Sequence, residues 1–161
     1  MIIVLRAKSG LYNGLMAALQ FIAIMCSALF AGAALYISIV EHPARMSAGI
    51  SVALQEFRPS YRRAAVFQII MAVVACVCSF ALSLFTSQWI WFLGGGMTGL
   101  MLPFTLIFMM PINRILLDAA SSLKESDAQN LLDRWGRLHL IRTIAGMVGF
   151  AILLAYSLRI R

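Results

Sequence analysis

The fold is decided by the stretch GLMAALQFIAIMCSALFAGAALYISIV at residues 14–40, which contains no charged side chain. A helix of roughly 20 apolar residues spans the hydrocarbon core of a bilayer, so this stretch is long enough to cross a membrane. Three further apolar runs follow at residues 64–85, 89–110 and 138–158. The pattern therefore predicts four transmembrane helices.

The composition of the whole chain agrees with a membrane protein. Of its 161 residues, 62% are hydrophobic and 12% are charged, and the mean hydropathy is +0.91. A soluble domain of this length cannot bury so much apolar surface. In lipid, only helices satisfy their backbone groups one segment at a time, and the alternation typical of a β-barrel is not visible. We predict an all-α fold, with a single integral membrane domain over residues 1–161. It is a four-helix transmembrane bundle with a polar, interfacial helical connection between the third and fourth spans.

The net charge of +7 comes from Lys and Arg in the connections and near the ends of the apolar runs. Anionic headgroups match such a distribution, so membrane lipids are the predicted partner and nucleic acid is not. With four spans, both termini lie on one side of the membrane and the two long connections lie on the other. Nine of the thirteen Lys and Arg belong to the connection side. The positive-inside rule therefore predicts cytoplasmic connections, in what we expect to be a bacterial inner membrane.

The two long connections differ in pattern. Residues 41–63 are polar and contain Pro43 and Pro59, which predicts a loop with one short surface helix. In residues 113–137, leucines are interspersed with charged side chains. This second pattern predicts a helix that lies at the interface or extends the third and fourth spans.

Polar groups in the fourth span lie on one helix face. Trp135, His139, Arg142, Gly146 and Gly149 are spaced four, three, four and three residues apart, which makes one stripe on a helix. The glycines predict close approach of a neighbouring helix, so that the larger side chains face the interior of the bundle. A charge at the depth of Arg142 is costly, which makes it a candidate for a functional site. The alternative is that its side chain snorkels to the headgroups.

The first span carries a similar stripe. Ala28, Gly32, Leu35, Ile39 and His42 follow the same spacing, so small residues lead to a histidine at the rim. Because a proline follows, helical geometry is disfavoured at His42, and we predict that the helix ends there. By itself His42 suits a structural role at the interface. A second histidine at the same membrane level favours a site.

The third span contributes a proline, an asparagine and a pair of glycines. Pro103 predicts a kink in the helix. Asn113 offers a donor and an acceptor at the level of the two histidines, either as a helix cap or as a ligand-binding group. Gly95 and Gly99 form a G-x-x-x-G pattern, which indicates close contact with another helix.

Several motifs occur in a fixed order along the chain. They are Leu29-Phe30-Ala31-Gly32, His42-Pro43-Ala44, Arg63-Ala64, Pro103-Phe104-Thr105, Pro111-Ile112-Asn113, and Trp135 followed by His139 and Arg142. By these motifs the chain resembles, from about Leu15 to Leu158, the anthrone oxygenase-like family of small integral membrane proteins. Fungal members of that family are associated with the oxidation of anthrones to anthraquinones.

The resemblance implies oxygenation of a lipophilic aromatic small molecule without a cofactor. The central methylene of an anthrone is acidic because its carbanion delocalises into an enolate, so the site needs a base and donors for the enolate oxygen. Imidazole is a suitable base near neutral pH, and guanidinium and amide groups are suitable donors. The predicted catalytic residues are His42, His139 and Arg142, with either histidine as the base. The predicted substrate-binding residues are Asn113, Trp135 and Arg63.

Two other functions are compatible with the same residues. One is a redox carrier, in which His42 and His139 bind haem or copper from different spans. The other is a non-catalytic membrane partner, in which Arg142 forms ion pairs within the bundle or with lipid phosphates. A homo-oligomer is compatible with each function. The three cysteines lie inside apolar runs, and we interpret them as small core residues without a disulfide or a shared metal.

Overall fold

The computed structural model describes the backbone of residues 2–118 and 123–159, with side chains from Gly10 onward in those ranges. Within them the chain is helical apart from short turns, and no strand is present. The first, second and fourth spans are built on α1 (Ile2–Tyr36), α3 (Ile50–Thr86) and α7 (Glu125–Arg159). The third is divided into α4 (Trp89–Gly99), α5 (Met101–Phe104), the π-helix η2 (Thr105–Met109) and α6 (Met110–Asp118). Four helical segments are long and apolar enough to cross a membrane, so the predicted all-α membrane fold is confirmed.

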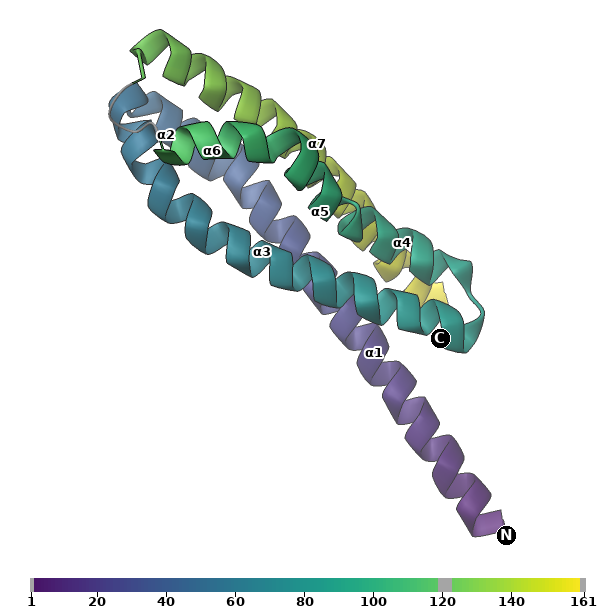
Figure 1. Cartoon of the computed structure of the whole chain (residues 1–161). Coiled ribbons are helices and arrows are strands. Elements are labelled where there is room, and N and C mark those ends of the chain that lie inside the picture. Colours follow the sequence, from purple (N-terminus) through teal and green to yellow (C-terminus); the bar gives the residue numbers. More distant parts are fainter. Residues whose placement is uncertain (1, 119–122, 160–161) are drawn as a thin grey trace.

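The termini and the two long connections of the chain lie at opposite ends of the bundle (Figure 1). Figure 1 places both termini and the short turn after α3 at one end, and the connections that contain α2 and follow α6 at the other. This arrangement agrees with the predicted topology. The charge count also used Arg161 and the side chains of Arg6 and Lys8, which lie outside the described residues, as do residues 119–122 of the last connection.

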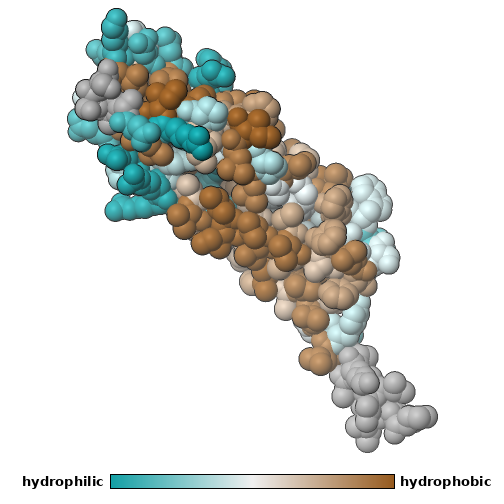
Figure 2. All heavy atoms as spheres, in the orientation of Figure 1, coloured by the Kyte–Doolittle hydropathy of each residue, from teal (hydrophilic) through white to brown (hydrophobic). Residues whose placement is uncertain are grey.

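The outer surface of the bundle is apolar along most of its length. Figure 2 shows hydrophobic side chains covering the middle of the molecule and hydrophilic ones gathered at the connection end. Large apolar residues such as Phe21, Val77 and Phe108 are more than half exposed. Exposed apolar area on this scale suits contact with lipid.

The first connection is not the predicted loop. After α1, the helix continues through the π-helix η1 (Ile37–Glu41) into α2 (His42–Ser47), and a turn at Gly49 leads into α3. Pro43 lies in the first turn of α2, where a missing N–H is tolerated, and the wider π turn lets the N–H of His42 reach the carbonyl of Ile37. Pro59 lies inside α3. The prediction that the helix ends at His42 was therefore wrong, and that residue has helical dihedral angles.

Gly49 allows the chain to reverse between α2 and α3. Its φ of 96° lies in a region that side-chain-bearing residues rarely adopt, and it directly precedes the first residue of α3.

The face of α1 that packs into the bundle differs from the predicted stripe. The buried residues of α1 include Ala23, Ser27, Phe30 and Ala34, and the buried face continues to Ile37 of η1. Gly32, which belongs to the predicted stripe, is exposed, and a Cβ atom added there would meet nothing within 4 Å. Small residues occur on both faces of α1, so spacing alone did not distinguish them.

The stripe on α7 is buried along its whole length, as predicted. Gly146 lies against the ring of Phe30. At Gly149, an added Cβ atom would lie 2.8 Å from the carbonyl oxygen of Gly94 and 2.9 Å from the hydroxyl of Thr98. The glycines therefore allow close approach of both α1 and α4 to α7, in agreement with the prediction.

Gly149→Ala is expected to lower the free energy of unfolding by about 1–3 kcal/mol, because the new methyl group meets backbone that cannot move away easily. The matched control is Gly32→Ala on the exposed face of α1, which we expect to be neutral or stabilising by about 0.5–1 kcal/mol. Detergent-solubilised variants would be unfolded with SDS and followed by circular dichroism. Equal effects of the two substitutions would contradict the assigned packing.

The third span bends where Pro103 was predicted to kink it. The proline has no N–H for the carbonyl of Gly99, and the helix is interrupted at Leu100 before α5 and η2 continue it. Before the bend, Gly95 and Gly99 pack against α3, which confirms the close contact predicted from their spacing. Beyond the bend, α5 and α6 have few contacts with α3 (Figure 1). The bend therefore moves the backbone of the third span away from α3, while side chains of α6 still contact α3 at the connection end.

Candidate functional site

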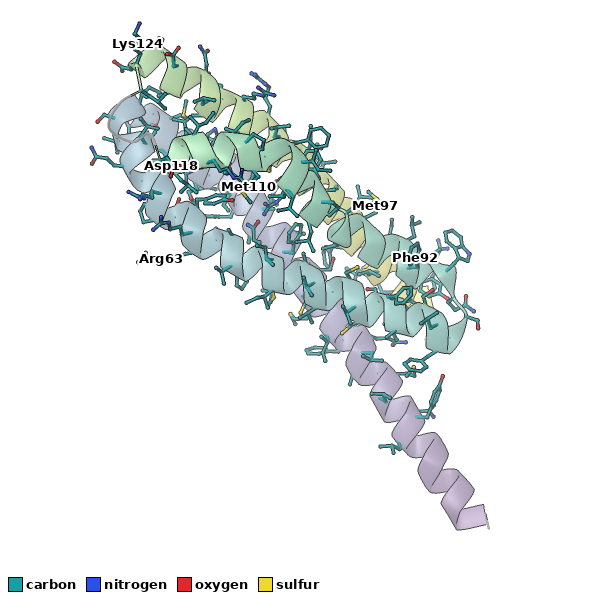
Figure 3. The ribbon with its side chains drawn as sticks, viewed as in Figure 1. Arg63, Phe92, Met97, Met110, Asp118 and Lys124 are labelled. Atoms are coloured by element: carbon teal, nitrogen blue, oxygen red, sulfur yellow. The ribbon has the colours of Figure 1, made fainter. Side chains whose placement is uncertain are left out.

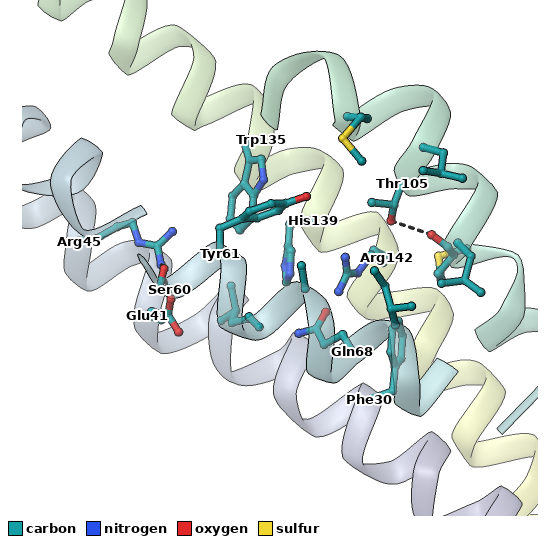
Figure 4. A pocket seen from close by; sticks show the side chains of 18 residues that line it. Phe30, Glu41, Arg45, Ser60, Tyr61, Gln68, Thr105, Trp135, His139 and Arg142 are labelled. Atoms are coloured by element: carbon teal, nitrogen blue, oxygen red, sulfur yellow. Dashed lines mark hydrogen bonds and ion pairs between the residues drawn. The ribbon is translucent and has the colours of Figure 1, made fainter. Parts of the chain in front are cut away.

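A cavity of about 300 Å³ lies among the four spans near the connection end. This volume is at the lower end of the range for small-molecule sites, about 300–1,000 Å³. Most of its lining is apolar and includes Phe30, Met101 and Leu102. The polar and charged residues that line it are Glu41, Arg45, Ser60, Tyr61, Gln68, Thr105, Trp135, His139 and Arg142 (Figure 4).

Arg142 brings a positive charge into this cavity. The residue is 8% exposed, and its guanidinium carbon lies 5.3 Å from the centre of the Phe30 ring. Among the described residues it has neither a hydrogen bond nor an ion pair, and its Nε atom is buried without a partner. The side chain lines the cavity and does not extend along the lipid face. A buried charge without a partner is costly, which makes Arg142 a candidate for binding an oxygen acceptor.

Gln68 is a second buried donor without a partner. It lies on α3, is 2% exposed and lines the cavity, and its Nε2 atom makes no hydrogen bond within the described part of the chain. Sequence reasoning missed this residue. The available signal was a single amide side chain five residues into the second apolar run, where polar groups are rare.

A chain of hydroxyl groups fixes the hydrogen position on His139. The hydroxyl of Thr143 lies 3.1 Å from the carbonyl oxygen of Ala34 and 3.0 Å from that of His139, and it must donate because carbonyls only accept. Ser38 then donates to Thr143, over 2.8 Å, and accepts from Nδ1 of His139, over 3.0 Å. The neutral imidazole therefore carries its hydrogen on Nδ1. Its Nε2 atom is left as an acceptor, with no partner in the described ranges.

A similar argument orients the hydroxyl of Tyr61. The indole N–H of Trp135 only donates, and it donates to Oδ1 of Asn113 over 2.9 Å. The amide nitrogen of Asn113 therefore faces Tyr61 and donates to its hydroxyl oxygen over 2.8 Å. Tyr61 thus accepts from Asn113, and its own hydrogen has no acceptor among the described residues. Asn113 is fully buried and does not line the cavity, so it positions Tyr61 and Trp135.

The structure brings His139, Arg142 and Trp135 together around the cavity but places His42 elsewhere. The Trp135 ring stacks on His139 with centroids 4.7 Å apart, and it also contacts His42 at 5.2 Å. His42 packs against Gly136 and lines a different, shallower hollow near the surface. The two imidazoles therefore do not share one open space.

The separation of the His42 and His139 imidazoles argues against the predicted alternative of a haem or copper ion bound by both. A shared iron or copper ion requires both imidazoles to face a common position. The residues present do not fit bis-histidine ligation by His42 and His139.

Arg63, predicted to bind substrate, is exposed and does not line the cavity. Figure 3 labels it on the outer side of α3, near the connection end. It lies close to the cavity residue Tyr61 in sequence but on another face of the helix.

An ion cluster around the buried Arg45 lines the cavity at the connection end. Arg45 is 6% exposed, forms an ion pair with Glu41, and has its Nε atom 2.6 Å from Oε2 of Glu56. It also donates to Ser60 over 2.9 Å. Sequence reasoning missed this cluster because residues 41–63 were predicted to be mainly loop. On the continuous helix that is present, Glu41 and Arg45 are one turn apart.

The fold and the cavity define a small membrane protein with a mostly apolar cavity among its helices. The chain belongs to the anthrone oxygenase family, whose family model matches residues 57–152, more than half of the chain. This confirms the predicted family. No curated protein and no solved structure matches the chain. The matched region contains Tyr61, Gln68, His139 and Arg142, whereas Arg45 precedes it.

Proposed function

We propose that the protein is a membrane-embedded oxygenase that oxidises a lipophilic aromatic ketone of the anthrone type without a cofactor. One observation carries this proposal. The imidazole acceptor, Nε2 of His139, shares an apolar cavity with donors on Arg142, Gln68 and Tyr61 whose hydrogens have no acceptor among the described residues. A base beside a set of oxygen-directed donors is the arrangement needed to form an enolate.

The first step is removal of a proton from the central methylene of the anthrone. Nε2 of His139 takes this proton, and the electron pair of the C–H bond moves into the ring system, which leaves negative charge on the ketone oxygen. Arg142 and Gln68 donate to that oxygen. The cavity is lined mostly by apolar side chains, so these charge-assisted bonds are stronger than they are in water.

The second step joins the carbanion to dioxygen, which is the oxidant. A carbon–oxygen bond forms at the former methylene, and the imidazolium of His139 returns its proton to the distal oxygen to give a hydroperoxide. Loss of the remaining hydrogen on that carbon, with cleavage of the O–O bond, releases water and leaves the second carbonyl. In total, one anthrone and one dioxygen give one anthraquinone and one water.

The aromatic walls of the cavity suit a flat substrate. Trp135 and Phe30 line the cavity, and each also contacts one of the two reactive side chains, at His139 and Arg142 respectively. Flat ring systems stack on such side chains. The substrate plane and the polar groups are thereby held in a fixed relation, which favours proton transfer.

The test is to purify the full chain in mild detergent and supply anthrone in air-saturated buffer. We expect anthraquinone to form with one dioxygen consumed per molecule and no hydrogen peroxide released, and the rate to be unchanged by metal chelators. Absence of turnover above the rate in protein-free detergent would refute the proposal. Turnover that disappears with a chelator would refute the cofactor-free mechanism.

A further inference from the structure

The side chains that line the cavity differ in their exposure on the outer surface of the bundle. The residues contributed by α1 and α7, such as Phe30 and His139, are buried. Ile69 of α3 and Leu106 of η2 also line the cavity, yet they are 52% and 63% exposed. A side chain that both lines a cavity and lies on the outer surface marks an opening. The opening therefore lies between α3 and η2, and we call Ile69 and Leu106 the doorway pair.

The backbone explains why the opening is there. The third span packs closely along α3 in α4 and then bends at Pro103, after which its contacts with α3 are few. The π-helix η2, which carries Leu106, follows this bend directly. Both sides of the opening are continuous helix, so their backbone hydrogen bonds are satisfied where they meet lipid.

The apolar surroundings of the opening are those expected of a surface that faces hydrocarbon. Ile69 lies five residues inside the apolar run that begins at residue 64, which is about 8 Å along a helix axis at 1.5 Å per residue. Its neighbours Ile70 and Ile107 are also exposed and apolar. Figure 2 shows hydrophobic side chains along this part of the surface. The opposite route, from the aqueous connection end, passes the ion cluster around Arg45, whose charged groups disfavour the entry of an apolar molecule.

We infer that the substrate enters the cavity sideways from the bilayer, between Ile69 and Leu106, and that this doorway pair controls access. The inference rests on the proposed function, since it assumes a lipophilic aromatic substrate. Such a molecule is concentrated in the hydrocarbon and reaches the cavity without crossing water. Gln68 directly precedes Ile69, so a ketone oxygen that passes the doorway pair meets the donors of Gln68 and Arg142 (Figure 4).

The inference is tested by narrowing the doorway without changing the polar groups. The full chain carrying Ile69→Phe and Leu106→Phe is reconstituted in phosphatidylcholine vesicles, and anthraquinone binding is followed by quenching of tryptophan fluorescence after rapid mixing. We expect association and dissociation both to slow by about tenfold, because a gate changes rates without changing the bound state. The equilibrium affinity stays within about twofold of wild type, which also shows that the variant is folded.

The matched control carries Ile70→Phe and Ile107→Phe. These neighbours are 50% and 64% exposed and do not line the cavity, so we expect wild-type rates. A second variant, Ile69→Ala with Leu106→Ala, widens the doorway and is expected to speed association.

The outcomes separate this inference from the proposed function. Unchanged binding rates in the narrowed variant, with anthrone still turned over by wild type, would overturn the doorway and leave the oxygenase proposal intact. Equal slowing in the control pair would also overturn the doorway, since the effect would not depend on the cavity. Absence of both anthraquinone binding and anthrone turnover in wild type would overturn both.

Discussion

His139→Ala is expected to slow anthrone oxidation by about 10²–10⁴-fold, the usual contribution of a general base. His42→Ala is expected to slow anthrone oxidation by less than about tenfold, because His42 contacts the cavity only through Trp135 and lines a separate hollow. The measurement is the rate of anthraquinone formation at saturating anthrone, with dioxygen consumption followed in parallel. The comparison identifies which of the two histidines is the base.

Chemical rescue distinguishes loss of the base from loss of structure. The alanine at position 139 leaves a space of the shape of imidazole next to Ser38, so added imidazole is expected to restore part of the activity. A merely packed histidine would not give this response. Equal losses in the two alanine variants, or a larger loss at His42, would contradict the assignment of His139 as the base.

The burial of the polar residues on α7 was predictable because these residues stand out from the apolar sequence around them. Trp135, His139 and Arg142 are large polar or aromatic groups at helical spacing, on a face that continues as glycines. Burial of a charge in an apolar run requires an interior position, and one helix has only one face that points there. The spacing was therefore sufficient to place these three side chains on the buried face of the bundle.

The α1 face and the polar residues of α3 were less predictable, for two physical reasons. Small residues occur around much of α1, so either of two neighbouring faces could pack, and the choice depended on the partner helices. Tyr61 lies in residues 41–63, which were predicted to be a loop with one short surface helix because of Pro43 and Pro59, whereas α3 continues through Pro59. Once the helix is continuous, Tyr61 and Gln68 are seven residues apart and share a face. Which hydroxyl donates to the cavity could only be deduced from the contacts of Asn113.

Arg142→Met is expected to reduce turnover by about 10²–10³-fold, the usual effect of removing an oxyanion donor. The same substitution is expected to raise the free energy of unfolding by about 1–4 kcal/mol, because a buried charge without a protein partner is replaced by an apolar side chain of similar length. Activity and stability would thus change in opposite directions, which is typical of a residue retained for a ligand. Turnover and unfolding in SDS would be measured on the same detergent preparations.

The matched control for this substitution is Arg63→Met, on the exposed side of α3. Because Arg63 does not line the cavity, the Arg63→Met variant is expected to have nearly the same turnover and the same free energy of unfolding as wild type. Arg142→Lys keeps the charge but loses the planar set of donors, and it is expected to recover only part of the activity. If Arg142 instead stabilises the bundle through ion pairs or lipid phosphates, Arg142→Met will lower the free energy of unfolding. A lower free energy of unfolding in this variant would favour the non-catalytic membrane partner over the oxygenase.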